Sequence, residues 1–262
     1  MAVYDLLAPH YDAVSGDSAT EAAFVDHVLR RAHPRPVTLL EVACGTGGII
    51  ASLADRYQVA GLDISPGMLA VARGKLPGGI PLHLADMSRF RLGAGFDAVI
   101  CVYHGINHLL GFPAWESFFD CALEHLNDGG VFVFDVLTIS TLQRIADGPE
   151  IVQQFGENYL RITVQASGEA KRKFGWNIEV REHQRDGSYK TLTEVIDTAS
   201  FPLGDVRAAL SERFAGVEII ESDGGVAGDG GEDRTWFVCT KPGPAARAGA
   251  YSGPPGPAGG SR

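Results

Sequence analysis

The sequence lacks the features expected of a nucleic-acid-binding or membrane protein. Its 262 residues contain 22 Lys and Arg against 32 Asp and Glu, a formal net charge of −10, and no basic stripe. Because phosphate backbones are bound by clustered cations, we expect no nucleic-acid partner. No apolar run is long enough to span a membrane, and no charged stretch followed by an apolar core opens the chain. We therefore expect an unexported, cytoplasmic protein with no membrane partner.

Cysteine is also scarce, and its spacing excludes the common cysteine-based sites. The four cysteines, Cys44, Cys101, Cys121 and Cys239, show neither paired metal-ligand spacing nor a short disulfide framework. Reduced thiols are the simplest interpretation. Cys44 and Cys101 lie beside or within expected strands, which favours buried small side chains over nucleophiles. We expect no metal site.

A glycine-rich turn is the main chemical signal, and it lacks one glycine. The short expected strand over 39–42, apolar except for Glu41, leads into Gly45-Thr46-Gly47 and then into an expected helix. Glycines let the backbone approach a ligand closely, and the following helix presents free N–H groups. A dinucleotide fingerprint needs a third glycine where this chain has Ile50. A nicotinamide-dependent oxidoreductase is therefore the weaker alternative.

Acidic residues close the next two expected strands. The strand over 58–64 ends at Asp63, whose carboxylate can bind both hydroxyls of an adenosine ribose. The strand over 81–85 is followed by Asp86 and Met87, which suit the amine and the face of an adenine. Since parallel strands end at one edge of a sheet, these side chains are expected beside the glycine-rich turn.

Together these residues resemble the class I S-adenosylmethionine-dependent methyltransferases, over nearly the whole chain from Tyr4 to about Lys241. The resemblance implies S-adenosylmethionine as cofactor, with the turn on its methionine part, Asp63 on the ribose, and Asp86 with Met87 on the adenine. Residues 41–47 and 103–108 look most like the enzymes that methylate amino groups of antibiotic sugars. The expected cofactor contacts are Tyr4, Tyr11, Glu41, Ala43, Gly45, Thr46, Gly47, Asp63, Ile64, Met68, Asp86, Met87 and Val102.

The expected fold is α/β: a Rossmann-like, seven-stranded, mostly parallel sheet with helices on both faces, and a small antiparallel insertion after the fifth strand. Five strands alternate with helices up to residue 137, and strands over 217–221 and 235–240 complete the sheet after a helix over 205–214. Ser18 and Glu21 predict a capping box for an early helix. Residues 1–241 form a single methyltransferase domain, and the Gly- and Pro-rich residues 242–262 are expected to be disordered.

Two segments are expected to cover the reacting centre. Residues 155–202 read as antiparallel strands with a hairpin turn at Asp186-Gly187-Ser188, and residues 1–17 read as a lid. Both would exclude water and hold a small-molecule acceptor in line with the methyl group. The alternative role of the strands is to make contacts in a homodimer.

His108 is the candidate catalytic base, because an imidazole just after the fourth strand can take the proton that an amine sheds. His104 is its rival, Tyr11 is a further candidate at the acceptor, and Asn107 is a candidate hydrogen-bond partner of the acceptor. A metal held by both histidines is disfavoured because no third ligand is evident nearby.

These observations predict methyl transfer to a small molecule in natural-product biosynthesis, of an antibiotic or an alkaloid, with an amine nitrogen as the expected target. Two alternatives remain open. Phe155, Tyr159, Phe174 and Trp176 could stack on an aromatic ring such as an indole for C-methylation, although core packing is the more common role. A binding module that holds the cofactor without catalysis would retain the same cofactor residues.

Overall fold

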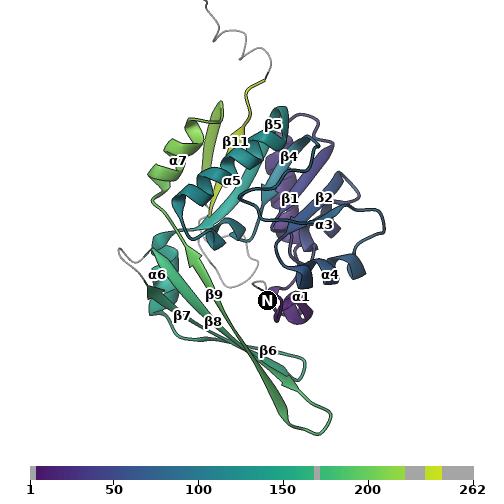
Figure 1. Cartoon of the computed structure of the whole chain (residues 1–262), viewed down its shortest axis with the longest axis vertical. Helices are drawn as coiled ribbons and strands as arrows, with labels where there is room; N and C mark the ends of the chain where they lie inside the picture. The colour runs from purple at the N-terminus through teal and green to yellow at the C-terminus, as the bar shows by residue number, and fades with distance from the viewer. Residues whose placement is uncertain (1–3, 168–171, 222–233, 244–262) are drawn as a thin grey trace, which may run out of the picture.

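The computed structural model describes residues 4–167, 172–221 and 234–243, which form two sheets (Figure 1). The larger sheet has seven strands in the order β10-β11-β5-β4-β1-β2-β3. β1 to β5 are parallel, whereas β11 is antiparallel to both β5 and β10. The expected mostly parallel sheet is thereby confirmed. Its strands are β1 Thr38–Val42, β2 Gln58–Asp63, β3 Leu82–Leu84, β4 Phe96–Cys101, β5 Leu126–Leu137, β10 Gly216–Glu221 and β11 Arg234–Thr240.

Helices cover both faces of this sheet, as the alternating sequence pattern predicts. One face packs against α2 (Ala19–Ala32), α3 (Gly48–Leu53) and α4 (Pro66–Lys75), and the other against α5 (Phe112–His125) and α7 (Leu203–Ser211). The second face is strongly aromatic, with Trp115 and Phe118 of α5 fully buried among the residues of β5. α7 begins and ends earlier than the expected 205–214. Among the described residues no helix is both long and apolar enough to cross a membrane.

The strand order places a ligand-binding crevice above β1. The chain runs outward from β1 to β2 and β3, and then returns to the other side of β1 through β4. Loops that follow β1 and β4 therefore diverge, and open α/β sheets bind ligands at such a switch point. β4 ends at Cys101, and a 3-10 helix, η2 (Gly105–His108), follows.

The start of α2 differs from the predicted capping box. Ser18 makes no capping bond with its side chain, and the backbone N–H of Ala19 is instead 3.0 Å from Asp17 Oδ1. Glu21 is buried and accepts a 3.3 Å bond from the Tyr103 hydroxyl. The capping box is therefore wrong, because the tertiary structure recruits Glu21 into the site described below.

The insertion between β5 and α7 is longer than predicted. It begins with α6 (Ile139–Asp147) and β6 (Ile151–Phe155), and continues with β7 (Asn158–Ser167), β8 (Lys173–His183) and β9 (Tyr189–Ala199) in a four-stranded antiparallel sheet. The predicted start at residue 155 misses β6 because its residues do not alternate between apolar and polar. The predicted β8–β9 hairpin is present, with Gly187 at a φ of 82°.

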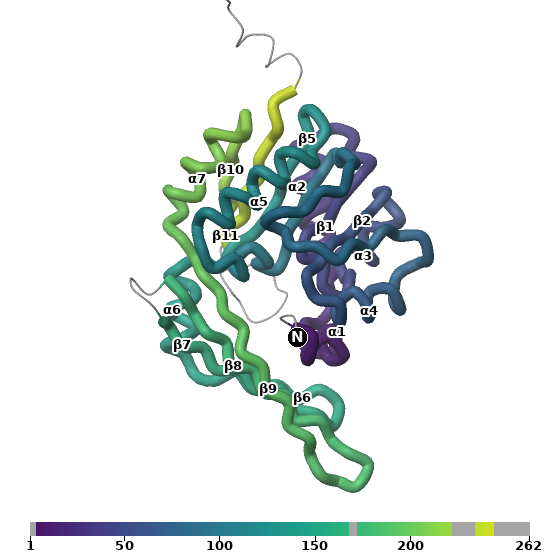
Figure 2. Tube along the Cα trace, in the orientation of Figure 1, coloured from purple at the N-terminus to yellow at the C-terminus, as the bar shows by residue number. Residues whose placement is uncertain are grey.

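The N-terminal segment lies between the two sheets (Figures 1 and 2). It contains only a 3-10 helix, η1 (Ala8–His10), and one short helix, α1 (Tyr11–Ser15). Leu7 is buried in an apolar cluster with Leu160 and Ile178 of the antiparallel sheet. Residues 1–3 of the proposed lid and residues 244–262 of the proposed tail lie outside the described residues.

Candidate active site

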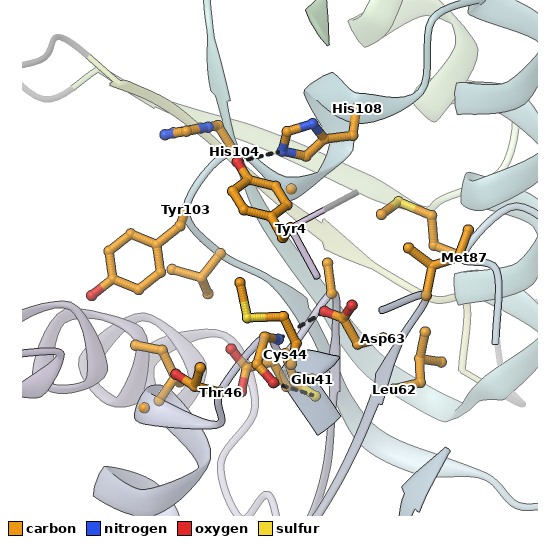
Figure 3. A pocket seen from close by; sticks show the side chains of 18 of the residues that line it. Tyr4, Glu41, Cys44, Thr46, Leu62, Asp63, Met87, Tyr103, His104 and His108 are labelled. Carbon is orange, nitrogen blue, oxygen red and sulfur yellow. Dashed lines mark hydrogen bonds between the residues drawn. The ribbon is translucent and has the colours of Figure 1, made fainter. Parts of the chain in front are cut away.

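A cavity of about 350 Å³ opens at the carboxyl ends of β1, β2, β3 and β4 (Figure 3). It brings together the candidate catalytic residues and every predicted cofactor contact except Gly47. Predicted residues on its wall are Tyr4, Tyr11, Glu41, Ala43, Gly45, Thr46, Asp63, Ile64, Met68, Asp86, Met87, Val102, His104 and His108. Residues that the sequence did not single out for the site also line it, among them Asp12, Tyr103, Leu109 and Arg234.

The glycine-rich turn presents open backbone to the cavity. Gly45 has a φ of 52°, and a Cβ built on it would meet no atom within 4 Å. A side chain here would therefore extend into the cavity while straining the backbone. The Gly45 N–H donates a 2.8 Å bond to Asp63 Oδ2, which ties the turn after β1 to the end of β2. This cradle fits close approach of a ligand to the backbone.

Gly47 serves packing rather than the cavity wall. Its φ is 76°, and a Cβ there would lie 2.8 Å from Leu76 Cδ1, just beyond α4. Gly47 does not line the cavity, although the sequence places it among the cofactor contacts. The glycine is needed because the turn passes closely over the end of α4.

Two buried carboxyl groups, Glu41 and Asp63, line the cofactor half of the cavity. Glu41 is 3% exposed, and its Oε2 is buried with no hydrogen-bond partner among the described residues. Burial raises the pKa of Glu41 well above its usual value and also raises the pKa of Asp63. Asp63 Oδ1 accepts a 2.8 Å bond from the Ser65 N–H, which fixes its orientation.

These carboxylates fit S-adenosylmethionine, which carries a sulfonium, an ammonium and a ribose diol. Either cation would stabilise the ionised form of a carboxylate whose pKa burial has raised. The orphaned Glu41 Oε2 offers a hydrogen-bond acceptor for an ammonium, and Asp63 retains lone pairs for hydroxyl donors. The donor set therefore suits the cofactor implied by the sequence.

The part of the cavity near the ends of β2 and β3 is apolar and suits an adenine ring. Met68 is buried, Ile64 is 54% exposed, and Met87 packs against the edge of the core. Asp86 Oδ1 accepts bonds of 2.9 Å and 2.8 Å from the Ser88 N–H and hydroxyl, so its carboxylate is held at the loop after β3. Thioether and aliphatic side chains pack well against a flat ring.

The N-terminal segment lines part of the cavity and is bonded to the core beside it. Thr46 donates a hydrogen bond to Asp12, and Lys75 Nζ lies 2.7 Å from the other Asp12 oxygen. Ser65 Oγ donates a 2.6 Å bond to Asp5. The hydroxyl of Thr46 therefore binds the covering segment, so its contribution to a cofactor site is through closure.

Tyr4 places its hydroxyl against the predicted base. Tyr4 Oη is 3.3 Å from His108 Nε2, and the two rings meet edge to face with centroids 5.3 Å apart (Figure 3). Burial lowers the pKa of His108 to about 4, so the imidazole is neutral at pH 7. Burial also raises the pKa of Tyr4, so the phenol keeps its proton. The neutral pair is consistent with a Tyr4 O–H donating to an imidazole lone pair.

His104 belongs to a buried charged cluster that includes Arg234, and both residues line the cavity. Its backbone N–H donates a 2.9 Å bond to Asp135 Oδ1, and Asp135 is fully buried. Arg234 lies 3.9 Å from Asp135 and 3.7 Å from Glu21, with its guanidinium 5.3 Å from the centroid of the Tyr103 ring. Burial lowers the pKa of the His104 ring well below its usual value.

Backbone strain is concentrated around the cavity. In the described ranges the non-glycine residues with positive φ are Tyr4 at 70°, Ala43 at 57°, Tyr103 at 58° and His104 at 49°, and all of them line it. Each such conformation costs on the order of 1 kcal/mol. Strain of this kind persists where surrounding contacts fix the backbone, and it marks functional sites.

One possible acceptor contact is contradicted by the structure, and another gains no support from it. Asn107 is fully buried and does not line the cavity, so it is not placed to bind an acceptor. The aromatic residues of the insertion also lie elsewhere: Phe174 is fully buried, Trp176 Nε1 donates to Thr198, and Tyr159 is 38% exposed. The geometry therefore gives no support to ring stacking by these residues during C-methylation.

The thiols are placed as expected. The four cysteines are buried and free, and burial raises the pKa values of Cys44 and Cys101 well above their usual range. Protonated, buried thiols are poor nucleophiles. In the described ranges no group of three or more metal-ligating side chains is close enough to hold a metal ion.

Arg234 and Asp12 were missed because neither carries a local motif. Arg234 is the one basic residue between 214 and 240, which is a weak signal in an acidic stretch. Asp12 lies in a segment without helical periodicity. Their roles depend on contacts with distant segments, as the 34-residue separation of Asp12 and Thr46 illustrates.

Comparison with known proteins agrees with this geometry. A family model described as a methyltransferase domain matches residues 39–130. A dTDP-3-amino-3,6-dideoxy-alpha-D-glucopyranose N,N-dimethyltransferase of Streptomyces fradiae is 39% identical over 138 residues, which are 51% of this chain and 51% of that enzyme. The dTDP-3-amino-3,4,6-trideoxy-alpha-D-glucopyranose N,N-dimethyltransferase of Streptomyces venezuelae is 33% identical over 165 residues, 62% of this chain and 67% of that enzyme. The chain thus matches between half and two thirds of the length of these relatives.

A solved structure gives a more extensive match. The S-adenosylmethionine-bound amino pentose methyltransferase CalS10 of Micromonospora echinaspora superposes with a TM-score of 0.72 at 28% identity, covering 92% of this chain and 97% of that one. This superposition extends over nearly the whole of both chains, so the two proteins share one fold. The chain belongs to the class I S-adenosylmethionine-dependent methyltransferases, and within them it is similar to the antibiotic-sugar N-methyltransferases.

Proposed function

We propose that this protein methylates an amine nitrogen of a small amino-sugar-like acceptor, with S-adenosylmethionine as methyl donor, in the biosynthesis of a natural product. The observation that carries the proposal is the neutral His108 imidazole on the cavity wall, facing Tyr4 at the end away from the cofactor carboxylates. The relatives support the amine and the sugar, because their names describe amino-sugar substrates.

The cofactor half holds the donor through Glu41, Asp63 and the Gly45 cradle. When bound, S-adenosylmethionine supplies an electrophilic methyl group on a sulfonium. The carboxyl groups of Glu41 and Asp63 would bind its cationic and hydroxyl groups, while Met68 and Met87 would pack against its base; all four residues line the cavity. The covering segment excludes water through the bonds of Asp12 and Asp5 to the core.

His108 handles the proton. An amine becomes nucleophilic once its nitrogen has a free lone pair, so a proton must leave before or during the formation of the new N–C bond. His108 Nε2 accepts that proton once the Tyr4 hydroxyl has released its hydrogen bond to this nitrogen, and the imidazolium passes the proton to solvent after product release. Because the low pKa of His108 makes its proton affinity weak, positioning of the amine by Tyr4 and His108 provides most of the acceleration.

The experiment is a screen for methyl transfer. The purified full chain is incubated with S-adenosylmethionine and a panel containing dTDP-3-amino and dTDP-4-amino sugars, free amino sugars, simple amines and indoles, and products are identified by mass spectrometry. Methylation confined to amino sugars supports the proposal. Methylation of the indoles alone would identify a C-methyltransferase, and tight cofactor binding without any product would favour the non-catalytic module.

A ligand-binding measurement tests the alternative that the protein is a nicotinamide-dependent oxidoreductase. A ligand that binds the folded protein raises its melting temperature according to its concentration and dissociation constant. We expect S-adenosylhomocysteine to raise the melting temperature and NAD to leave it unchanged. A shift with NAD alone would contradict the proposed cofactor.

A further inference from the structure

Asn107 joins three parts of the molecule through one side chain. It is fully buried in η2, the turn that ends with His108. Its Nδ2 donates to the carbonyl oxygen of Leu137 at 3.1 Å and to that of Ala199 at 2.8 Å. Its Oδ1 accepts a 3.0 Å bond from the Leu137 N–H. Both amide protons and the amide oxygen are therefore engaged by backbone groups.

The two backbone partners have a special place in the chain. Leu137 is the last residue of β5, where the chain leaves the parallel sheet, and Ala199 is the last residue of β9, where the antiparallel sheet ends. The residues between them make up α6 and the whole four-stranded sheet. Asn107 thus binds the exit point and the return point of the insertion from the turn that carries His108.

We propose that Asn107 is a positioning residue that fixes the insertion relative to His108. An asparagine suits this role because its amide can donate twice and accept once in a rigid plane. Loss of the amide would remove three hydrogen bonds to buried backbone groups of Leu137 and Ala199, so the junction would loosen. The inference rests on the proposed function only in so far as His108 acts on the acceptor.

A second hydrogen bond holds the start of η2 in place, so we expect the substitution of Asn107 to affect only the acceptor side of the site. The His104 N–H is bound by Asp135 of β5, so the start of the turn stays attached when Asn107 is changed. The cofactor carboxylates Glu41 and Asp63 belong to β1 and β2, which make no bond with Asn107. We therefore expect a change in the insertion and at the acceptor, with cofactor binding preserved.

The test compares Asn107→Ala and Asn107→Asp with a matched control, His125→Ala. His125 is also buried and also bridges backbone groups, since its ring nitrogens lie 2.7 Å from the Cys121 carbonyl oxygen and 3.0 Å from the Leu92 nitrogen. It lies in α5 and does not line the cavity. His125→Ala therefore also removes buried hydrogen bonds to the backbone, but none to the insertion.

The first readout needs no acceptor. Hydrogen exchange of the full chain should show at least tenfold faster exchange over β7, β8 and β9 in Asn107→Ala, while His125→Ala keeps wild-type exchange there. The affinity for S-adenosylhomocysteine, measured by calorimetry, should stay within about threefold of the wild type in both variants. Unchanged exchange in the insertion, or an equal loss of cofactor affinity, would overturn the positioning role.

The second readout is the pH dependence of Asn107→Asp. Its carboxylate would face the oxygens of Leu137 and Ala199, and only the protonated acid can donate one of the two missing bonds. Protection of the insertion, corrected for intrinsic exchange rates, should therefore recover as the pH falls, a trend absent from the wild type. Protection that does not change with pH would contradict the positioning role of Asn107. Asn107→Asp also provides a test if Asn107→Ala fails to fold.

The third readout uses an amino sugar that the screen shows to be methylated. Asn107→Ala should lower kcat at least tenfold with the KM for S-adenosylmethionine unchanged, since a small displacement of reacting groups can cost on the order of 100-fold. Wild-type kcat would overturn the role. If the wild type methylates nothing, the proposed function fails while the exchange result still decides the role of Asn107.

Discussion

Tyr4 and His108 are 104 residues apart in the chain, yet the Tyr4 hydroxyl lies 3.3 Å from His108 Nε2. The Tyr4 backbone is fixed as well, because its N–H donates a 2.7 Å bond to Glu194 Oε1 on the antiparallel sheet. One residue of the covering segment therefore touches both the insertion and the proposed base. The positive φ of Tyr4 shows that this placement is maintained against a local conformational cost.

Tyr4→Phe removes the hydroxyl and keeps the ring packed against Tyr11 and His108. We expect kcat to fall by about three- to tenfold, corresponding to one neutral hydrogen bond, with cofactor affinity unchanged. Steady-state kinetics with a methylated amino sugar measure this. Tyr57→Phe is the control, because its hydroxyl bonds Asp26 at 2.6 Å away from the cavity. A Tyr4→Phe enzyme with wild-type kcat would show that the hydroxyl has no part in turnover.

His108→Gln tests the assignment of the base. Loss of a general base typically lowers kcat by about 100- to 10,000-fold, whereas the cofactor wall is untouched. We expect a smaller effect from His104→Gln, since the anchoring bond of His104 is made by its backbone N–H. Turnover and S-adenosylhomocysteine affinity are measured for both variants. A larger loss of kcat in His104→Gln would transfer the role of base to that residue.

Asp63→Ala tests the cofactor half of the cavity. The substitution removes a carboxylate that binds the N–H groups of Gly45 and Ser65 and faces the cavity. We expect S-adenosylhomocysteine to bind about 10- to 100-fold more weakly, as hydrogen bonds to charged groups contribute roughly 1.5 to 3 kcal/mol. Calorimetry measures the change.

Asp97→Ala is the matched control for Asp63→Ala. Asp97 Oδ2 likewise accepts backbone N–H bonds, from Val37 at 2.9 Å and Thr38 at 3.0 Å, but at the start of β1. This variant should be less stable and bind S-adenosylhomocysteine normally. Equal weakening in both variants would mean that the Asp63 effect reflects stability alone.

The pKa of His108 predicts a loss of stability in mild acid. Its pKa falls from about 6.5 in the unfolded chain to about 4 in the folded protein, so the unfolded state binds more protons between these values. The stabilisation is present above pH 6.5 and is lost as the pH falls towards 4. Between pH 7 and pH 5 the contribution of this group to the free energy of unfolding should drop by about 2 kcal/mol.

Urea denaturation at the two pH values measures this contribution. His108→Gln carries no titrating imidazole, so its free energy of unfolding should depend less on pH by that amount. His27→Gln is the control, since His27 does not line the cavity. An identical pH dependence in wild type and His108→Gln would show that the His108 imidazole is not held neutral in the folded protein.

Much of the fold and of the cofactor half follows from local sequence. Apolar strands, a glycine-rich turn and acids at the ends of β2 and β3 lie within a few residues of one another in the chain, and the parallel topology aligns their ends. Gly45, Asp63 and Met87 were predictable for this reason. Ser18 and Glu21 show the limit of local reasoning, because a valid capping pattern was overridden when the Tyr103 hydroxyl offered Glu21 a buried partner.

The sequence by itself determined the alternation of strands and helices, the donor-binding turn and the identity of the candidate histidines, because these depend on residue type and short spacing. Tertiary structure decided which histidine meets Tyr4, that Asn107 faces backbone rather than acceptor, and that Arg234 and Asp12 belong to the site. Each of these contacts joins segments far apart in the chain. These contacts form only when the two sheets pack against each other, and a local pattern of side chains does not specify how distant segments meet.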